Sequence, residues 1–279
     1  MLKVDNLNYG YPKTDEKILE NISFVLEEGT LCGLFGPNGC GKSTLFKCCL
    51  NLLKPRQGRI HINGKSIKRL KTKEMAKLAA YVPQEHKPPF PYLVREVVLM
   101  GRTPHLKGFF GISARDREKV EQALDLLEIS HLSEKNYNTL SGGQRQMVLM
   151  ARAIAQEARI MFLDEPTSAL DFSNQIKIWN IMRKISGRGI TIFACSHDPN
   201  HVAWFCDKVV VVKDKRVFSS GRPGDVISQQ TLDSIYKDTC RVKQVDDTKI
   251  VFPSNLNRFQ GFENREQLKP PVCGVGANI

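Results

Sequence analysis

The spacing of apolar positions predicts a chain that begins with strands. Residues 2–9 and 18–26 mix apolar and polar side chains and contain many β-branched or aromatic residues, which is typical of strands with one buried face. Residues 30–36, TLCGLFG, form a continuous apolar run that ends in glycine, which indicates a fully buried strand. The segment KSTLFKCCLNLL that follows predicts a helix, which Pro55 helps to end.

A helical segment is predicted in the middle of the chain, at about residues 85–155. It starts with the proline-rich QEHKPPFPYL, for which we expect an ordered but irregular loop. In SARDREKVEQALDLLEI, Ser113 and Asp116 have the spacing of a helix cap, and the apolar residues fall on one face. Residues 142–157 are apolar on nearly every side, so we expect a buried helix. The whole segment has the character of a helical subdomain inserted into an α/β domain.

Strands and helices alternate beyond the helical segment. A helix is predicted over residues 172–186, and three further strands have the sequences RIMFLDE, ITIFACS and DKVVVVKD. This alternation favours an α/β fold with a mostly parallel sheet joined by crossover connections. We expect one domain over residues 1–245. Residues 246–279 should form a C-terminal extension of irregular structure, because periodicity fades there and is lost from about residue 252.

Composition excludes several classes of protein. The chain of 279 residues has no apolar run near the roughly 20 residues that span a bilayer, and its start, MLKVDNLNYGYP, lacks the pattern of a secretion signal. We therefore expect a protein that is made and kept in the cytosol. The eight cysteines form no CxxC pair, so we expect neither a disulfide framework nor a zinc site. Cys40 differs from the other cysteines because it lies inside a glycine-rich loop, where we expect thiol reagents to reach it.

The formal net charge of +12 is high, and positive residues concentrate between residues 54 and 77, where the only acid is Glu74. Three interpretations stay open: a solvated face, a surface near the negatively charged cytoplasmic leaflet of a membrane, and a nucleic-acid site. No recognition motif accompanies the charge, so we expect no nucleic acid among the partners. The basic residues of this segment are Lys54, Arg56, Arg59, Lys65, Lys68, Arg69, Lys71, Lys73 and Lys77.

GPNGCGKS, residues 36–43, matches the phosphate-binding pattern G-x-x-x-x-G-K-[ST]. Its glycines allow successive backbone N–H groups to turn toward phosphate oxygens. Lys42 should reach the β- and γ-phosphates of a nucleotide, and Ser43 should offer its hydroxyl to Mg²⁺. Because a buried strand precedes this phosphate loop and a helix follows it, we favour a nucleotide site over a simple glycine-rich turn.

Two consecutive carboxylates, Asp164 and Glu165, end the strand RIMFLDE. Side chains alternate along a strand, so the two carboxylates should point in different directions. We expect Asp164 to help hold Mg²⁺ and Glu165 to act as the general base that polarises an attacking water. The pair therefore adds hydrolysis to nucleotide binding.

LSGGQ, residues 140–144, predicts a second anion site at the start of the buried helix. Ser141 and the two glycines expose backbone N–H groups there. One nucleotide cannot easily occupy two phosphate cradles of one molecule that are separated by a helical segment. Both cradles make sense if the nucleotide lies between two copies of the chain.

These motifs together resemble a known family. The phosphate loop, LSGGQ, FLDEP, SALD and SHD, in this order and spacing, are similar to those of the nucleotide-binding subunit of an ABC transporter, over about residues 1–245. The resemblance implies a P-loop NTPase fold of ABC type, in which an antiparallel β subdomain and an inserted helical subdomain accompany the mostly parallel core sheet. It also implies ATP and Mg²⁺ as cofactors, and ATP hydrolysis coupled to transmembrane transport.

The resemblance assigns roles to further residues. Tyr11 matches the aromatic residue that stacks on adenine, and Asp171, in SALD, matches a residue that reaches across the dimer. Gln84 matches the glutamine that touches Mg²⁺ and water, and His197 matches the switch histidine that contacts the γ-phosphate and orients the catalytic glutamate. The expected catalytic residues are thus Glu165, His197 and Gln84, and the expected metal contacts are Ser43, Gln84 and Asp164. The expected nucleotide contacts are Tyr11, Gly36, Pro37, Asn38, Gly39, Cys40, Gly41, Lys42, Ser43, Thr44, Ser141, Gly142, Gly143, Gln144 and Asp171.

By the same resemblance, two copies form a head-to-tail dimer with ATP between the phosphate loop of one copy and LSGGQ of the other. Transport requires integral-membrane permease subunits, which place the chain at the cytoplasmic face of the cell membrane, with an extracytoplasmic substrate-binding protein as an indirect partner. YLVREVVLMGRTPHL, LSGGQRQ and HDPNHV are most similar to ATPases of importers for iron-siderophores, haem, cobalamin and some oxyanions. Ala169 departs from this pattern, because many siderophore-type ATPases have histidine there.

Two other functions stay open. Some ABC ATPases act on nucleic acid or ribosomes, and others power exporters. DNA-repair members carry long coiled-coil insertions and ribosomal members carry two ATPase halves, whereas this chain has a compact segment at 84–141 and one phosphate loop. We therefore favour the importer. The loop after Gln84 and the helix near YLVREVVLMGR should form the groove that receives the permease.

Overall fold

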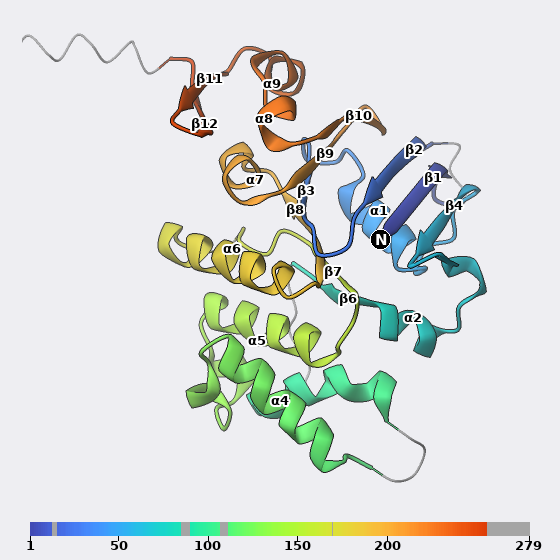
Figure 1. Cartoon of the computed structure of the whole chain (residues 1–279), viewed down its shortest axis with the longest axis vertical. Coiled ribbons are helices and arrows are strands. Elements are labelled where there is room, and N and C mark those ends of the chain that lie inside the picture. The colour runs from blue at the N-terminus through green and yellow to red at the C-terminus, as the bar shows by residue number, and fades with distance from the viewer. Residues whose placement is uncertain (13–15, 85–89, 107–110, 169, 256–279) are drawn as a thin grey trace, which may run out of the picture.

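A six-stranded sheet forms the centre of the molecule (Figure 1). The computed structural model describes residues 1–12, 16–84, 90–106, 111–168 and 170–255. The strand order is β10-β9-β3-β8-β7-β6, in which β10 pairs antiparallel with β9 and all other neighbours are parallel. The predicted α/β fold with a mostly parallel sheet is confirmed. The strands are β3 (Leu31–Phe35), β6 (Ala79–Val82), β7 (Ile160–Leu163), β8 (Thr191–Ser196), β9 (Lys208–Lys213) and β10 (Arg216–Gly221).

A separate antiparallel sheet, of order β2-β1-β4-β5, packs beside this core (Figure 1). Its strands are β1 (Leu2–Tyr9), β2 (Leu19–Leu26), β4 (Gln57–Ile62) and β5 (Lys65–Ser66). Aromatic rings join the two sheets: Phe46 of α1 (Lys42–Cys49) contacts Phe162 and Phe193 at centroid distances of 5.2 and 5.0 Å. Phe193 in turn contacts Phe24 of β2 at 5.4 Å. This packing fixes α1, and hence the loop between β3 and α1, against the core.

The helices of the middle segment gather at the lower end of the molecule (Figure 1). The predicted cap of α4 is confirmed, because the Asp116 N–H donates to Ser113 Oγ at 3.2 Å and the Ser113 N–H donates to Asp116 Oδ2 at 3.1 Å. The elements of this segment are α3 (Val94–Leu99), η2 (Met100–His105), α4 (Ala114–Leu126), η4 (Ser130–Leu132), η5 (Tyr137–Thr139) and α5 (Gly142–Ala155).

Arg102 of η2 ties three parts of the helical segment together, although no sequence pattern pointed to it. The side chain is 3% exposed. Its Nε donates to Asp116 Oδ1 at 3.0 Å, and its Nη1 donates to the Ala155 carbonyl at 2.6 Å and to Glu157 Oε2 at 2.8 Å. The network therefore links η2 and α4 to the end of α5.

The remaining helices connect or follow the strands of the core. Crossovers contain η1 (Ile67–Arg69) and α2 (Thr72–Leu78) before β6, α6 (Phe172–Ser186) after β7, and α7 (Pro199–Phe205) after β8. After β10 come α8 (Pro223–Val226), α9 (Gln229–Tyr236), β11 (Cys240–Val245) and β12 (Thr248–Pro253). In the described part of the chain, no helix is long and apolar enough to cross a membrane.

The irregular structure expected from residue 246 onward is wrong for β12. This strand pairs antiparallel with β11, from Cys240 opposite Pro253 to Val245 opposite Thr248. Most β12 residues are half-buried, so neither face of the strand is clearly apolar or clearly polar. The sequence therefore lacks the alternation of apolar and polar positions by which a strand is predicted. Residues 256–279 of the expected extension, and Ala169, lie outside the described residues.

Candidate nucleotide site

The phosphate loop lies between β3 and α1, as predicted, and its shape depends on glycine. Gly36 has φ +152°, and a Cβ there would lie 2.1 Å from the Val212 carbonyl oxygen. Gly41 has φ +101° and precedes the first residue of α1. Inside the loop, Lys42 Nζ donates to the carbonyls of Gly36 at 2.8 Å and Pro37 at 3.0 Å. The ammonium group is therefore held across the loop, at the start of a helix whose dipole favours anions.

Ser43 and Asp164 meet at the carboxyl ends of β3 and β7. Ser43 Oγ donates to Asp164 Oδ1 at 3.1 Å, and the Tyr81 hydroxyl donates to Asp164 Oδ2 at 3.2 Å. Asp164 is buried, and burial is the main cause that raises the pKa of Tyr81. Tyr81 was missed by the sequence analysis, although its place near the end of a strand next to β7 is a signal that could have found it.

These two oxygen donors suit Mg²⁺, which prefers oxygen ligands and is often held by few protein groups together with substrate phosphates. Among the described residues, no group of three His, Cys, Asp or Glu side chains could hold a metal alone. A magnesium ion at Ser43 and Asp164 would therefore depend on phosphate oxygens for its other ligands.

Glu165 and Asp164 have different partners, as predicted, although strand alternation is not the reason, because β7 ends at Leu163. Its Oε2 accepts a hydrogen bond from Gln84 Nε2 at 3.1 Å and lies 3.7 Å from His197 Nδ1. The residue has φ +48°, a left-handed conformation that is strained for a glutamate by about 1–3 kcal/mol. The three predicted catalytic residues thus come together. The Gln84 amide is directed at Glu165 and, at 3.4 Å, at Ser168 Oγ, rather than at the Ser43–Asp164 pair.

A small cavity of about 50 Å³ lies beside this carboxylate, lined in part by Glu165, Ser168 and His197. This volume is enough for a water molecule, and the lining offers it polar partners. Glu165 is therefore in a position to accept a proton from a water in this cavity.

Tyr11 lies close to the phosphate loop. Its hydroxyl is 3.4 Å from Thr44 Oγ1, its ring packs edge-on against Tyr9 at 5.2 Å, and the residue is 40% exposed. An exposed aromatic face next to a phosphate loop is suitable for stacking on a base. Tyr11, which follows β1, therefore lies next to the first turn of α1.

LSGGQ lies at the start of α5, as predicted. The Gln144 N–H donates to Ser141 Oγ at 3.3 Å and the Ser141 N–H donates to Gln144 Oε1 at 3.1 Å, so the two residues form a capping box. Asp171 caps α6 through its side chain alone: Oδ1 accepts from the Asn174 N–H at 2.9 Å and Oδ2 accepts from Asn174 Nδ2 at 2.6 Å. These hydrogen bonds lower the pKa of the Asp171 carboxyl. Within the described residues, no hydrogen bond or ion pair joins Ser141 or Asp171 to the phosphate loop. The expected nucleotide contacts therefore form two clusters in one copy.

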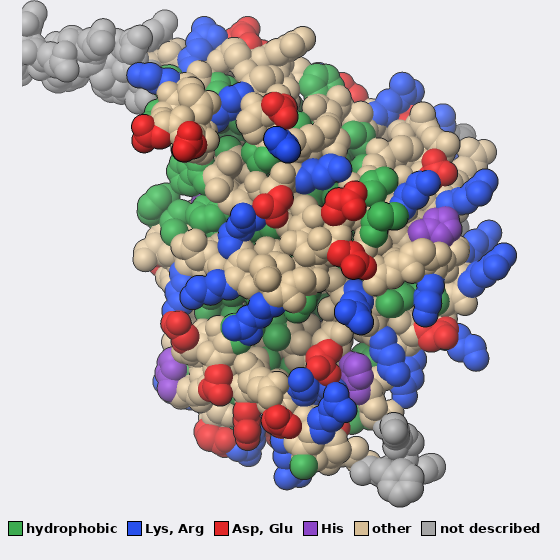
Figure 2. All heavy atoms as spheres, in the orientation of Figure 1, with side chains coloured by type: hydrophobic (Ala, Val, Ile, Leu, Met, Phe, Trp, Pro, Cys, Tyr) green, Lys and Arg blue, Asp and Glu red, His purple; other side chains and the backbone are tan. Residues whose placement is uncertain are grey.

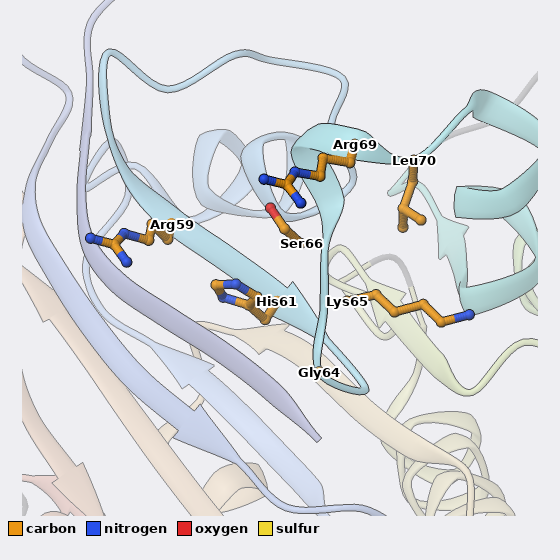
Figure 3. Close-up of a pocket in the computed structure, with 7 residues that line it drawn as sticks. All are labelled: Arg59, His61, Gly64, Lys65, Ser66, Arg69 and Leu70. Carbon is orange, nitrogen blue, oxygen red and sulfur yellow. The ribbon is translucent and has the colours of Figure 1, made fainter.

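The basic segment at residues 54–77 touches the site at one end, where Arg56 Nη2 donates to the Tyr11 carbonyl at 3.2 Å, and extends away from it. In Figure 2, lysine and arginine side chains gather along the edge formed by β4, β5 and α2. Arg59, His61, Lys65 and Arg69 line a hollow of about 580 Å³ there, with Ser66 between them (Figure 3). None of the predicted nucleotide contacts lines this hollow.

Comparisons with known proteins agree with these motifs. A family model described as ABC transporter matches residues 19–168. The chain is 32% identical over 257 residues to the ferric enterobactin transport ATP-binding protein of Escherichia coli, a match that covers 90% of this chain and 93% of the relative.

Two solved structures have the same fold. A metal-chelate type ABC transporter in an inward-facing conformation has a chain with a TM-score of 0.79 and 31% identity, over 90% of this chain and 96% of the other. A dimeric ATP-binding cassette bound to ADP and phosphate has a TM-score of 0.71 and 28% identity, over 80% of this chain and 99% of the other. The chain therefore belongs to the ABC transporter family and is one of its ATP-binding proteins, an ATPase.

Proposed function

We propose that this chain is the ATP-hydrolysing subunit of a membrane importer whose cargo is an iron-siderophore or a related metal chelate. The observation that carries the proposal is Glu165, held between Gln84 and His197 at the end of β7, next to the Ser43–Asp164 pair. The cargo class is supported by the names of the relatives, which include a ferric enterobactin transport protein and a metal-chelate type transporter. Haem, cobalamin and oxyanions remain alternatives within the same class of importer.

In one copy, Lys42 and the N-terminus of α1 bind the phosphates of ATP, and Tyr11 stacks on the adenine. Ser43 and Asp164 would hold Mg²⁺, which would neutralise charge on the phosphate oxygens. Glu165 takes the proton of the attacking water. His197 lies beside Glu165 and faces the γ-phosphate, while the Gln84 amide holds the Glu165 carboxylate by a hydrogen bond.

A second copy completes the site. Ser141 and the N-terminus of α5 form an anion site that is separate from the phosphate loop of its own chain. A head-to-tail arrangement brings this site onto the γ-phosphate bound by the partner. ATP then contacts both copies, so its binding favours the closed dimer and its hydrolysis favours opening.

The permease docks in a groove between α1, α2 and η2. The groove has a volume of about 370 Å³ and is lined by residues that include Leu52, Met75 and Met100. Leu52 is 65% and Met100 is 39% exposed, which is unusual for large apolar residues and typical of an interaction surface. The expected groove combined the loop after Gln84 with the helix near YLVREVVLMGR. Met100 and Gly101 of that sequence line the groove, and the loop at residues 85–89 lies outside the described residues. Such docking places the chain at the cytoplasmic face of the membrane.

Purification of the tagged chain from gently solubilised native membranes tests this proposal. We expect a polytopic permease to copurify and to stimulate ATP hydrolysis. Leu52→Glu should abolish both effects without changing basal ATPase activity, whereas Phe218→Glu on β10, also an exposed apolar residue, should change neither. Recovery only with nucleic acid or ribosomes would overturn the transport function, and stimulation by a permease in the efflux direction would favour an exporter.

A further inference from the structure

A tyrosine outside the nucleotide motifs contacts the catalytic histidine from the C-terminal part of the chain. The Tyr236 hydroxyl, at the end of α9, donates to the backbone carbonyl of His197 at 3.1 Å. Its ring packs against Phe35 at a centroid distance of 6.2 Å and an interplanar angle of 65°. Phe35 ends β3 and directly precedes Gly36. Tyr236 therefore bridges the start of the phosphate loop and the histidine.

The position of the His197 imidazole depends on its backbone. The side chain is 54% exposed, and its nearest acidic atom, Glu165 Oε2, is 3.7 Å from Nδ1, which is too long for a strong hydrogen bond. A side chain with so few restraints follows the main chain that carries it. Burial raises the pKa of Tyr236 to about 12, so the phenol stays protonated and keeps donating to the carbonyl throughout the neutral range.

The C-terminal hairpin of β11 and β12 contacts α7, the helix that follows His197. Asn200 of α7 pairs with β12 as a strand residue would: its Oδ1 accepts from the Val251 N–H at 2.8 Å and its Nδ2 donates to the Val251 carbonyl at 3.0 Å. Trp204 Nε1 also donates to the Lys249 carbonyl at 3.1 Å. The helix that follows His197 is thus clamped by β12, and Gln229 of α9 joins the hairpin through the Cys240 carbonyl at 2.9 Å.

We propose that Tyr236 is a positioning residue for ATP hydrolysis, which fixes the backbone at His197 and so sets the distance between its imidazole and Glu165. The inference rests on the proposed function, because it requires that His197 act with Glu165. Tyr236 touches neither nucleotide nor water in this role. Its hydroxyl donates to the His197 carbonyl, and its ring packs on Phe35, which precedes the phosphate loop. The two contacts together fix the position of the His197 backbone relative to that loop.

Tyr236→Phe tests the inference, because it removes the hydroxyl and keeps the ring on Phe35. Loss of the hydrogen bond to the His197 carbonyl should misplace the imidazole in the transition state. We therefore expect kcat to fall by about threefold to tenfold, with KM for ATP unchanged. Tyr92→Phe, which removes a hydroxyl from a tyrosine of the helical segment, is the matched control and should leave kcat unchanged. In a double-mutant cycle, adding Tyr236→Phe to His197→Ala should cause no further loss.

A second readout separates positioning from general loosening of the fold. The imidazole ring signals of His197, assigned by His197→Ala in NMR spectra, should move in Tyr236→Phe at fixed pH, while the ring signals of His61 and His105 should stay in place. An unchanged kcat or unmoved His197 ring signals would overturn the inference and leave the proposed function intact. If His197→Ala itself hydrolyses ATP at the wild-type rate, the proposed role of His197 is wrong and the positioning role falls with it.

Discussion

Replacement of Arg102 should reveal how strongly the helical segment depends on one buried ion pair. Arg102→Met leaves the Asp116 carboxylate buried without its cation and removes the hydrogen bonds to the Ala155 carbonyl and Glu157. Breaking a buried pair by removal of one partner typically reduces the free energy of unfolding by about 3–5 kcal/mol. The matched control is Arg95→Met, which breaks the pair of Arg95 with Glu134, two side chains that are at least half exposed. There we expect a loss below about 1 kcal/mol.

The pH dependence gives a second test of the same ion pair. A hydrogen bond from Ser113, followed by the Arg102 contact, lowers the pKa of Asp116 from 3.8 to about 2. The unfolded chain therefore binds this proton at a higher pH than the folded chain. The stabilisation is fully present above about pH 4 and is lost as pH falls toward 2, with a size of about 2 kcal/mol.

Urea denaturation of the wild type, Arg102→Met and Arg95→Met measures both effects. At pH 7 we expect a large loss for Arg102→Met and a small one for Arg95→Met. Between pH 4 and pH 2, the stability of Arg102→Met should fall less than that of the wild type, because part of the shift in the Asp116 pKa is gone. Equal losses for the two variants at pH 7 would refute the assignment of Arg102 as the link between η2, α4 and α5.

Three further predictions concern the site and its surroundings. Gly36→Ala should weaken ATP binding at least about tenfold more than Gly39→Ala in a fluorescent-nucleotide titration, because a Cβ at Gly36 meets the Val212 carbonyl whereas one at Gly39 meets nothing within 4 Å; similar affinities would contradict this. Burial lowers the pKa of His201, so the unfolded state takes up this proton at a higher pH than the folded state, and the melting temperature should fall as pH drops below about 6.5. His201→Gln should reduce this dependence on pH, and an unchanged dependence in the variant would disprove the burial argument. Cys40 is partly buried, whereas the other cysteines of the described chain are buried, so peptide mapping should find Cys40 alkylated first among these. The reaction should be slow, because partial burial raises the pKa of the thiol, and slower still with ATP; faster labelling of a core cysteine would count against the fold.

The sequence predicted those parts of the site whose signal is local. The phosphate loop, the Asp164–Glu165 pair and the cap at Ser141 are each contained in a few consecutive residues. A strand or helix predicted next to each motif indicated where in the fold the motif lies. His197 was placed near Glu165 only by its resemblance to the switch histidine of a known family. The structure gives the physical reason, since the two residues follow the neighbouring parallel strands β8 and β7.

The contacts that the sequence analysis missed join distant segments. Tyr236 reaches His197 across 39 residues, and nothing in the local sequence marks this tyrosine. Tyr81 reaches Asp164 across 83 residues, and its only signal was its place near the end of a strand next to β7. The buried Arg102 was missed for the same reason, because its carboxylate partner lies on another helix. The strand β12 was missed because its half-buried residues do not alternate. These are the features that tertiary packing, rather than periodicity, decides.

Trapping of a dimer by ATP tests the central claim most directly. Glu165→Gln should bind ATP but not hydrolyse it, so light scattering after gel filtration should show a species of twice the 31.5 kDa chain mass in ATP and a monomer without it. Adding Ser141→Arg should prevent the dimer, because the arginine blocks the anion site at the start of α5. Hydrolysis by Glu165→Gln at the wild-type rate would contradict the assignment of the base. A dimer that forms without ATP, or that survives Ser141→Arg, would contradict the arrangement in which ATP lies between two copies.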